Sequence, residues 1–338
     1  MATRTWDGDT NTDWATAANW SGDTLPVDAD TVIFDGRYVT GPTTGMTDGT
    51  AVNSGVDGSN AFALMHIKNT FTGNIGTAAL PCCCMPTTLI IEGSGTYHIN
   101  CAETNQSTNA TIARVIINNL NATVYLYSNA NDGANTCEFT RVDLIAGTLY
   151  AAFYSADTDD QGVYIANLYV APQNNSASAA TVIIEKDAYK VNGTVATNIE
   201  MSNGTLRSDS MIGTLVLNDG TVNYGSENIT TTVVSEADMN IAAIRQYGGT
   251  FNWYPDDTAG DPTITTIDVF GGLFDASQNG ATYSPDIAKT LADVRLYRGA
   301  TMKLNNNRAN ITVTSYRDFG GTLTTDTGAK IAVTYDTA

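Results

Sequence analysis

Basic residues are scarce in this chain, and so are charged residues in general. The 338 residues include 16 Lys and Arg against 35 Asp and Glu, which gives a formal net charge of −19, and only 15% of residues are charged. Soluble domains carry about 25% charged residues, so the acidity reflects a shortage of bases. A protein this acidic cannot release counterions from a phosphate backbone and is repelled by anionic lipid. We therefore expect neither nucleic acid nor a membrane as a partner.

Long apolar runs are also missing. No run approaches the roughly 20 residues that a membrane-spanning helix needs. No apolar core follows the opening Met-Ala-Thr-Arg, so the chain is not expected to use signal-peptide-dependent secretion. Hydrophobic residues nevertheless make up 42% of the chain, which is enough for a large core and excludes global disorder.

Residues and motifs typical of catalytic sites are few. The two histidines, His66 and His98, are too scattered for a hydrolytic triad. The sequence has no nucleophile elbow, phosphate-binding loop or dinucleotide fingerprint. We therefore expect no cofactor.

Two acidic clusters are the strongest catalytic candidates. Each lies in a turn-rich segment beside aromatic residues, as paired carboxylates do in enzymes that cleave polysaccharides. The alternative interpretation is a solvated loop whose aspartates cap turns. We favour the loops and expect no catalytic residue. The clusters are Asp157, Asp159 and Asp160, and Asp256, Asp257 and Asp261.

The chain has few cysteines, and their number is odd. Three of the five cysteines are consecutive, at 82–84, and the others are Cys101 and Cys137. Adjacent residues of an extended chain point in opposite directions, so the run is a poor disulfide framework. A zinc site shared with the histidines is an alternative, but the spacing is irregular. We expect free thiols, partly buried, in a reducing compartment, and no metal site.

Short β-type runs recur along most of the chain. They are rich in Val, Ile, Thr and Tyr, which suit a pleated and half-buried surface, and Gly, Asn and Asp separate them. Only residues 285–296 carry a passable helical pattern. The pattern predicts an all-β chain, with runs such as residues 88–92, 114–118, 122–127, 181–185, 214–218 and 311–315.

Many of these runs lead into a glycine, then a small residue and a second strand. From Gly220 onward the glycines are spaced by 29, 23, 27 and 22 residues, which is within the range of solenoid coils. A β-sandwich with similar hairpin turns is the alternative. We favour a single-stranded parallel β-helix (solenoid) over residues 86–338, with corners at Gly147, Gly204, Gly220, Gly249, Gly272, Gly299 and Gly321.

The first 85 residues differ in composition. They contain three of the four tryptophans, and residues 36–60 are a low-complexity run of Gly, Thr, Asp and Asn that predicts a loop-rich arm. We expect residues 1–85 to form an N-terminal segment in which large aromatics cap the first coil. The same aromatics could anchor a partner, because Trp is favoured at interface hot spots. These residues are Trp6, Trp14, Trp20 and Phe34.

The pattern T-W-D-G, D-W, A-N-W, P and D-x-V-I-F within residues 5–36 resembles the opening motif of bacterial and phage β-solenoid surface proteins, including autotransporter-type repeat proteins. The absence of a signal segment favours a phage structural protein, and the chain looks like a capsid decoration (cement) protein. Such proteins are commonly trimers.

The resemblance implies a non-enzymatic virion protein, made in the host cytoplasm, that stabilises the capsid exterior as a homotrimer bound to the major capsid protein. Attachment would use Trp6, Trp14, Trp20 and Phe34 together with the arm. The alternatives are a tailspike- or fibre-like protein that binds or depolymerises polysaccharide, and a bacterial surface adhesin.

Overall fold

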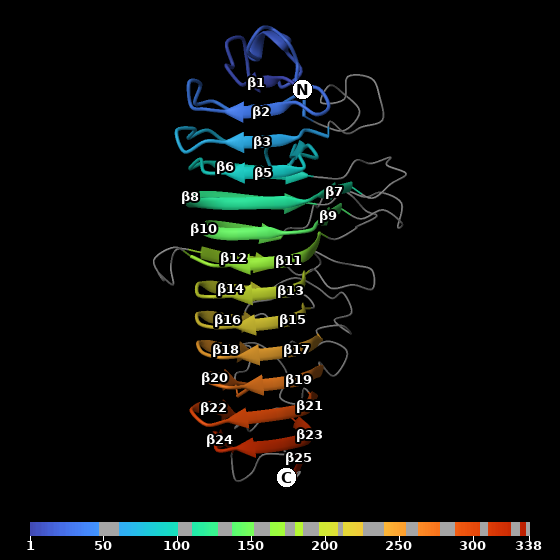
Figure 1. The fold of residues 1–338 in the computed structure, drawn as a ribbon, viewed down its shortest axis with the longest axis vertical. Helices are drawn as coiled ribbons and strands as arrows, with labels where there is room; N and C mark the ends of the chain where they lie inside the picture. The colour runs from blue at the N-terminus through green and yellow to red at the C-terminus, as the bar shows by residue number, and fades with distance from the viewer. Residues whose placement is uncertain are drawn as a thin grey trace. The chain divides into compact units, whose positions relative to one another are not determined.

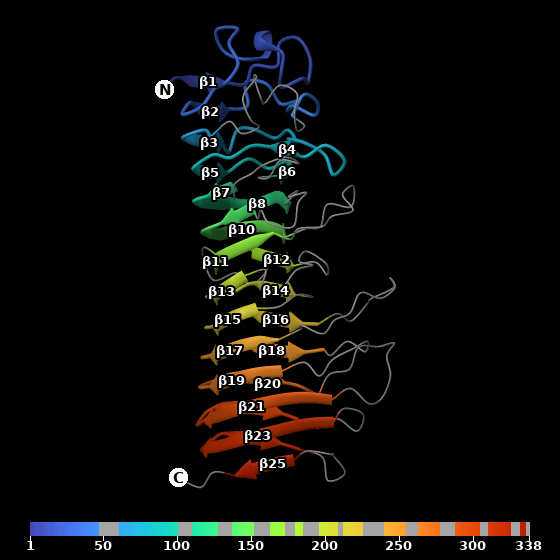
Figure 2. The ribbon, with the colours of Figure 1, turned by 90° about the vertical axis from the view of Figure 1, so that its right-hand side faces the viewer.

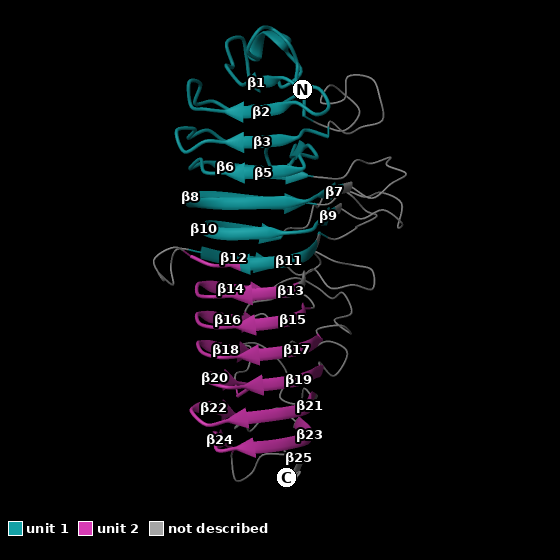
Figure 3. Ribbon diagram, viewed as in Figure 1, with its two compact units in different colours: residues 1–169, 179–195 teal, residues 170–178, 196–338 magenta. Residues whose placement is uncertain are grey.

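The computed structural model describes residues 1–46, 61–100, 110–127, 137–151, 163–172, 180–184, 196–208, 212–225, 240–254, 263–277, 288–304, 310–325 and 332–335. These residues form parallel β-solenoid coils, and their only helix is the short 3-10 turn η1 (Ala17–Asn19). They divide into two compact units (Figure 3): unit 1 holds residues 1–169 and 179–195, and unit 2 holds residues 170–178 and 196–338. The expected parallel β-solenoid is confirmed.

Unit 1 stacks its strands in parallel ladders (Figure 1). One ladder runs β1–β2–β3–β5–β8–β10 and a second runs β4–β6–β8–β10–β12. The strands are β1 (Thr3–Thr5), β2 (Thr31–Phe34), β3 (Leu64–Ile67), β4 (Cys82–Cys83), β5 (Thr88–Ile91), β6 (Thr96–Asn100), β7 (Ala110–Ile112), β8 (Arg114–Tyr127), β9 (Cys137–Phe139), β10 (Val142–Ala151), β11 (Tyr164–Val170) and β12 (Ala180–Ile184).

Unit 2 repeats one coil design, with two strands per coil that form two columns (Figure 2). The odd-numbered strands pair in one parallel ladder and the even-numbered strands in another. The strands are β13 (Ala196–Met201), β14 (Thr205–Ser208), β15 (Ile212–Leu217), β16 (Thr221–Tyr224), β17 (Ile241–Gln246), β18 (Thr250–Trp253), β19 (Thr263–Val269), β20 (Gly272–Asp275), β21 (Ala288–Tyr297), β22 (Ala300–Lys303), β23 (Asn310–Phe319), β24 (Thr322–Thr324) and β25 (Ala332–Tyr335).

Glycines form the corner between the two strands of each coil in unit 2. Gly249 and Gly272 have φ of +66° and +78°, which only glycine adopts readily. A Cβ at Gly249 would collide with the carbonyl oxygen of Gly220, and one at Gly272 with that of Gly249. At the last corner the positive φ belongs to Gly320 and not to Gly321, which corrects the expected position by one residue.

The core of unit 2 consists of like side chains repeated from coil to coil. Phe251 and Phe274 stack at 5.0 Å between ring centroids, and Ile244 lies above Ile267 in the ladder. These side chains are fully buried. Outward-facing rows also repeat, with threonines at 205, 221 and 250 in register. Because each coil repeats its neighbour's contacts, stability accumulates coil by coil.

The helical pattern of residues 285–296 was misleading, because residues 288–297 form strand β21. Its buried residues Leu291, Val294 and Leu296 align with Ile264, Ile267 and Val269 of β19. Leu291 and Val294, like Ile264 and Ile267, are therefore three residues apart, as on a helix face. No helix among the described residues is long and apolar enough to cross a membrane.

The expected division at residues 85 and 86 falls within one ladder of unit 1. Strand β3 lies before this point and pairs in parallel with β5 after it, with Met65 opposite Leu89. Strands β1 and β2 of the N-terminal segment belong to the same ladder. The two compact units divide near residues 170–195, and the expected boundary of the N-terminal segment stays a prediction.

Candidate partner-binding surfaces

The predicted aromatic cluster exists in unit 1 and is tightly packed. The rings of Trp6 and Trp14 each meet Trp20 edge to face, with centroids 5.1 and 4.7 Å away. Phe34 of β2 lies 6.0–6.1 Å from all three tryptophans. Buried indole groups need hydrogen-bond acceptors. Trp20 Nε1 donates to the Trp14 carbonyl oxygen at 2.8 Å, and Trp6 Nε1 donates to that of Thr40 at 2.9 Å.

These four side chains are at most 1% exposed. They form the interior of the N-terminal cap and do not present a surface that a partner could contact directly. Any attachment through this part of the chain must therefore use the residues that cover the cluster. The role of the cap in attachment stays a prediction.

A buried asparagine holds the cap loop in place. Asn19 Oδ1 accepts hydrogen bonds from the backbone N–H groups of Thr10 and Asn11, at 2.9 and 3.1 Å. Its Nδ2 donates to Asn11 Oδ1 at 2.7 Å and to the Asp13 carbonyl oxygen at 2.8 Å. The Asn-Trp dipeptide of the opening motif thus combines a polar anchor, Asn19, with an apolar one, Trp20. The motif revealed both residues, but not the role of Asn19.

The first part of the expected arm packs against the cap. The backbone N–H of Trp14 donates to the Thr44 carbonyl oxygen at 3.0 Å, and the backbone N–H of Thr43 donates to the Thr12 carbonyl oxygen at 3.0 Å. Met46 is fully buried. The rest of the arm, residues 47–60, lies outside the described residues.

Unit 2 carries an exposed row of stacked rings, which we call the aromatic ladder: Tyr247, Phe270, Tyr297 and Phe319. Successive ring centroids are 4.9, 4.4 and 4.8 Å apart, and the rings are within 20° of parallel. Tyr247 is 51% exposed and Phe319 is 46% exposed. The two inner rings are half-buried.

The sequence contains the signal for this ladder, although it was overlooked. Tyr247, Phe270 and Phe319 each precede a Gly-Gly pair at a corner, and Tyr297 precedes Arg-Gly. Because the coils are in register, residues at the same corner position stack on one another. A search for residue types at a fixed offset from the corner glycine would have found them.

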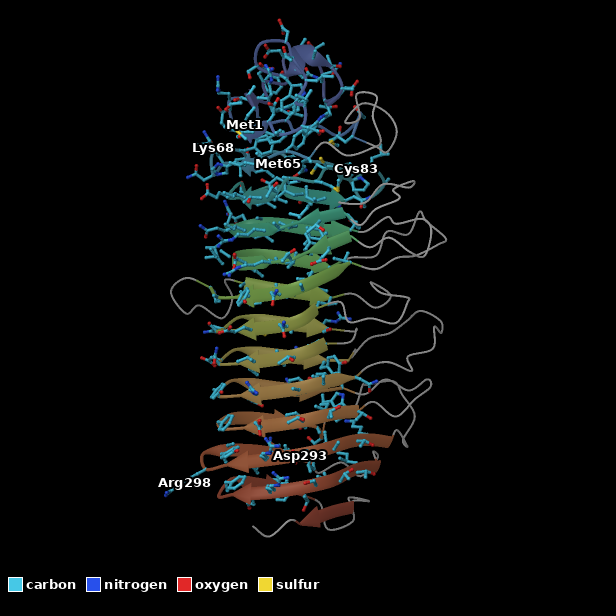
Figure 4. The ribbon with its side chains drawn as sticks, turned by 45° about the vertical axis from the view of Figure 1, so that its right-hand side comes forward. Met1, Met65, Lys68, Cys83, Asp293 and Arg298 are labelled. Atoms are coloured by element: carbon cyan, nitrogen blue, oxygen red, sulfur yellow. The ribbon has the colours of Figure 1, made fainter. Side chains whose placement is uncertain are left out.

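Arginines concentrate beside the aromatic ladder. Arg295 forms ion pairs with Asp293 at 2.6 Å and with Asp268 at 3.2 Å, and Arg317 lies 3.8 Å from Asp293. Arg298 follows Tyr297 directly and is exposed. Figure 4 shows Arg298 extending outward at the strand edge, away from Asp293. Arg295 and Arg317 are thus balanced by aspartates, whereas Arg298 adds a positive charge beside the exposed rings.

A lysine is buried in the same unit. Lys289 is fully buried, and its Nζ donates to the carbonyl oxygens of Ala276 at 3.0 Å and Trp253 at 3.3 Å. The ammonium group also lies 5.1 Å from the centre of the Trp253 ring. Burial lowers the pKa of Lys289 to about 7, although the charge of Asp275 opposes this. No sequence pattern marks Lys289 as buried, because lysine is normally found on a solvated face.

The other predicted residues are not brought together in one site. His66 Nε2 lies 2.9 Å from Glu92 Oε2, whereas His98 Nδ1 lies 2.8 Å from the Tyr127 hydroxyl. Burial lowers the pKa of His98. Within the described part of the chain, no group of three or more His, Cys, Asp and Glu side chains could hold a metal ion. Both acidic clusters and Cys101 lie outside the described residues, and only the backbone of Cys137 is described.

Comparisons of the chain with protein-family models, with curated proteins and with solved structures found no match.

Proposed function

We propose that this chain is a non-enzymatic structural protein that decorates and stabilises the exterior of a phage capsid. It binds the major capsid protein, acts as a homotrimer and is made in the cytoplasm of the infected cell. Binding to the assembled shell alone would shift the assembly equilibrium toward the shell. The acidic remainder of the surface would keep the particle soluble.

The aromatic ladder is the observation that carries this proposal. Protein interfaces are enriched in Tyr, Phe, Trp and Arg, and their hot spots favour Tyr, Trp and Arg. The ladder offers exposed edges of Tyr247 and Phe319, with Arg298 beside Tyr297. A continuous apolar stripe on a soluble protein indicates a contact surface.

Ring geometry favours a protein partner over a glycan. Sugars stack on the open face of an aromatic ring, but the two inner rings, Phe270 and Tyr297, have a neighbouring ring over each face at 4.4–4.9 Å. Their edges, which remain, suit contacts with apolar side chains. The alternative of a tailspike-like depolymerase depends on the acidic clusters at 157–160 and 256–261, which lie outside the described residues.

The test adds purified chain to heads from a phage whose copy of the gene has been deleted. We expect the chain to sediment with the heads and to raise the temperature at which they break open. The double variant Tyr247→Ser, Phe319→Ser should bind at least about tenfold more weakly, because two exposed aromatic anchors are lost. Each of these rings ends the ladder and stacks on one neighbour only, so the coils should still form.

The matched control is Leu120→Ser. Leu120 is 67% exposed and belongs to unit 1, so the variant removes exposed apolar area that is not part of the ladder. We expect it to bind heads like the original protein. Failure of the original chain to bind heads would overturn the proposed function. Equal binding by the double variant and the control would leave the ladder without its assigned role.

A further inference from the structure

Three sulfur atoms meet in the interior of unit 1. The Cys84 Sγ lies 3.8 Å from the Met65 Sδ, and the Cys82 side chain interacts with that of Cys84. Cys82 and Met65 are fully buried, and Cys84 is 2% exposed. Figure 4 labels Met65 and Cys83, which lie at about the same height in unit 1. We call Cys82, Cys84 and Met65 the sulfur cluster.

Strand alternation explains why the cluster forms from three consecutive cysteines. Side chains two residues apart on an extended chain share a face, and the residue between them points the other way. Cys82 lies in β4, opposite Ile99 of β6, and points into the core, as Cys84 does. Cys83 is half-buried. Met65 enters from β3, where it is one of the inward-facing residues.

We propose that the sulfur cluster is a binding site for one soft monovalent metal ion, copper(I) or its analogue silver(I). Thiolate and thioether sulfurs are the ligands that select copper(I) over the harder divalent ions. Metal–sulfur bonds of about 2.3 Å around a three-coordinate ion place the sulfur atoms about 4 Å apart. The distance of 3.8 Å between Cys84 and Met65 is close to this value. The ion would replace the thiol hydrogen that now lies between the sulfurs.

Charge balance suits a monovalent ion. The metal-free cluster carries no charge while both thiols hold their protons. Binding of one M⁺ ion with loss of one thiol proton to solvent leaves the site neutral, with one thiolate, one thiol and one thioether around the ion. A divalent ion would leave a net charge in an apolar core unless a second proton were lost, and isolated buried charge is costly.

The test titrates the reduced full-length chain with copper(I) under anaerobic conditions, against a chromophoric copper(I) chelator. We expect one tightly bound ion, with the ultraviolet absorption of copper(I) thiolate and X-ray absorption that reports three sulfur neighbours. Cys82→Ser and Cys84→Ser should each weaken binding at least about 100-fold. Met65→Leu, which conserves volume, should weaken it about tenfold and remove one sulfur neighbour.

Cys83→Ser is the matched control, because it removes a thiol from the same run but not from the cluster. It should bind copper(I) like the original chain. Circular dichroism of every metal-free variant checks that the fold is kept, and silver(I) should raise the melting temperature of the original chain and of Cys83→Ser more than that of the other variants. Equal binding by Cys82→Ser, Cys84→Ser and the original chain would overturn the proposal, as would equal loss in Cys83→Ser.

Discussion

Lys289 determines how part of unit 2 responds to pH. Its pKa is lowered to about 7 from an ordinary 10.5, so between these values the folded chain binds fewer protons than the unfolded chain. Stability then rises with pH across this window, and below pH 7 the full cost of the buried charge is present. We expect the free energy of unfolding to rise by about 1.4 kcal/mol per pH unit between pH 7 and 9.

Comparison with Lys289→Met isolates this contribution, because methionine fills the space without a titrating group. Urea unfolding of both proteins from pH 6 to 9 gives the difference between their stabilities. That difference should change steadily in favour of the original chain as pH rises. A difference independent of pH would show that Lys289 stays protonated in the fold.

At the level of the element, the corner glycines differ in how much room surrounds them. Gly249 and Gly299 both have positive φ, but a Cβ at Gly299 meets nothing within 4 Å, whereas one at Gly249 meets the Gly220 backbone. Gly299→Ala should therefore cost only the conformational strain, about 1–2 kcal/mol. Gly249→Ala adds the collision, and we expect a further 1–3 kcal/mol.

Hydrogen exchange is the suitable measurement, because stacked repeats open locally. In Gly249→Ala the backbone amides of β16 and β18 should exchange faster. The increase in exchange rate should correspond to the stability that this variant loses. Gly299→Ala provides the control at β22. Equal protection in the two variants would contradict a close-packed corner at Gly249.

The strands and corners were predictable from the sequence because both are local signals that repeat. Glycine spacing located each corner of unit 2, and only the last was misplaced, where adjacent Gly320 and Gly321 both fit the pattern. The pattern of residues 285–296 was misleading because buried positions three residues apart occur both on a helix and in strand β21. Pairing with β19 and β23 determines that this segment is a strand and not a helix. The sequence of the segment alone does not contain that pairing.

At the level of the whole molecule, clustering of side chains was easier to predict from the sequence than their exposure to solvent. The tryptophans of the opening motif do meet, but exposure depends on what covers them, and that is decided by segments far apart in the chain. The contact surface of the proposal is instead the ladder, whose members are separated by 22–27 residues and meet only because the coils stack. Lys289 was unpredictable for the same reason.

The proposed homotrimer is a prediction about the whole molecule. A homotrimer would bring three aromatic ladders to one shell, and simultaneous contacts strengthen attachment beyond that of a single copy. Light scattering after size-exclusion chromatography should give three times the chain mass of 35.7 kDa. A monomer mass at the concentrations that decorate heads would contradict the trimer.

The stacked corner glycines also make unit 2 divisible. Residues 249–271 span one full coil, from one corner to the residue before the next. Without this coil, Gly272 would stack on Gly220 and Phe274 would lie over Val222. The corner would still place glycine on glycine, and the core would still place one apolar side chain on another. Copies of this gene can therefore gain or lose whole coils by unequal recombination and still encode a closed stack. The length of the protein can change in discrete steps of one coil.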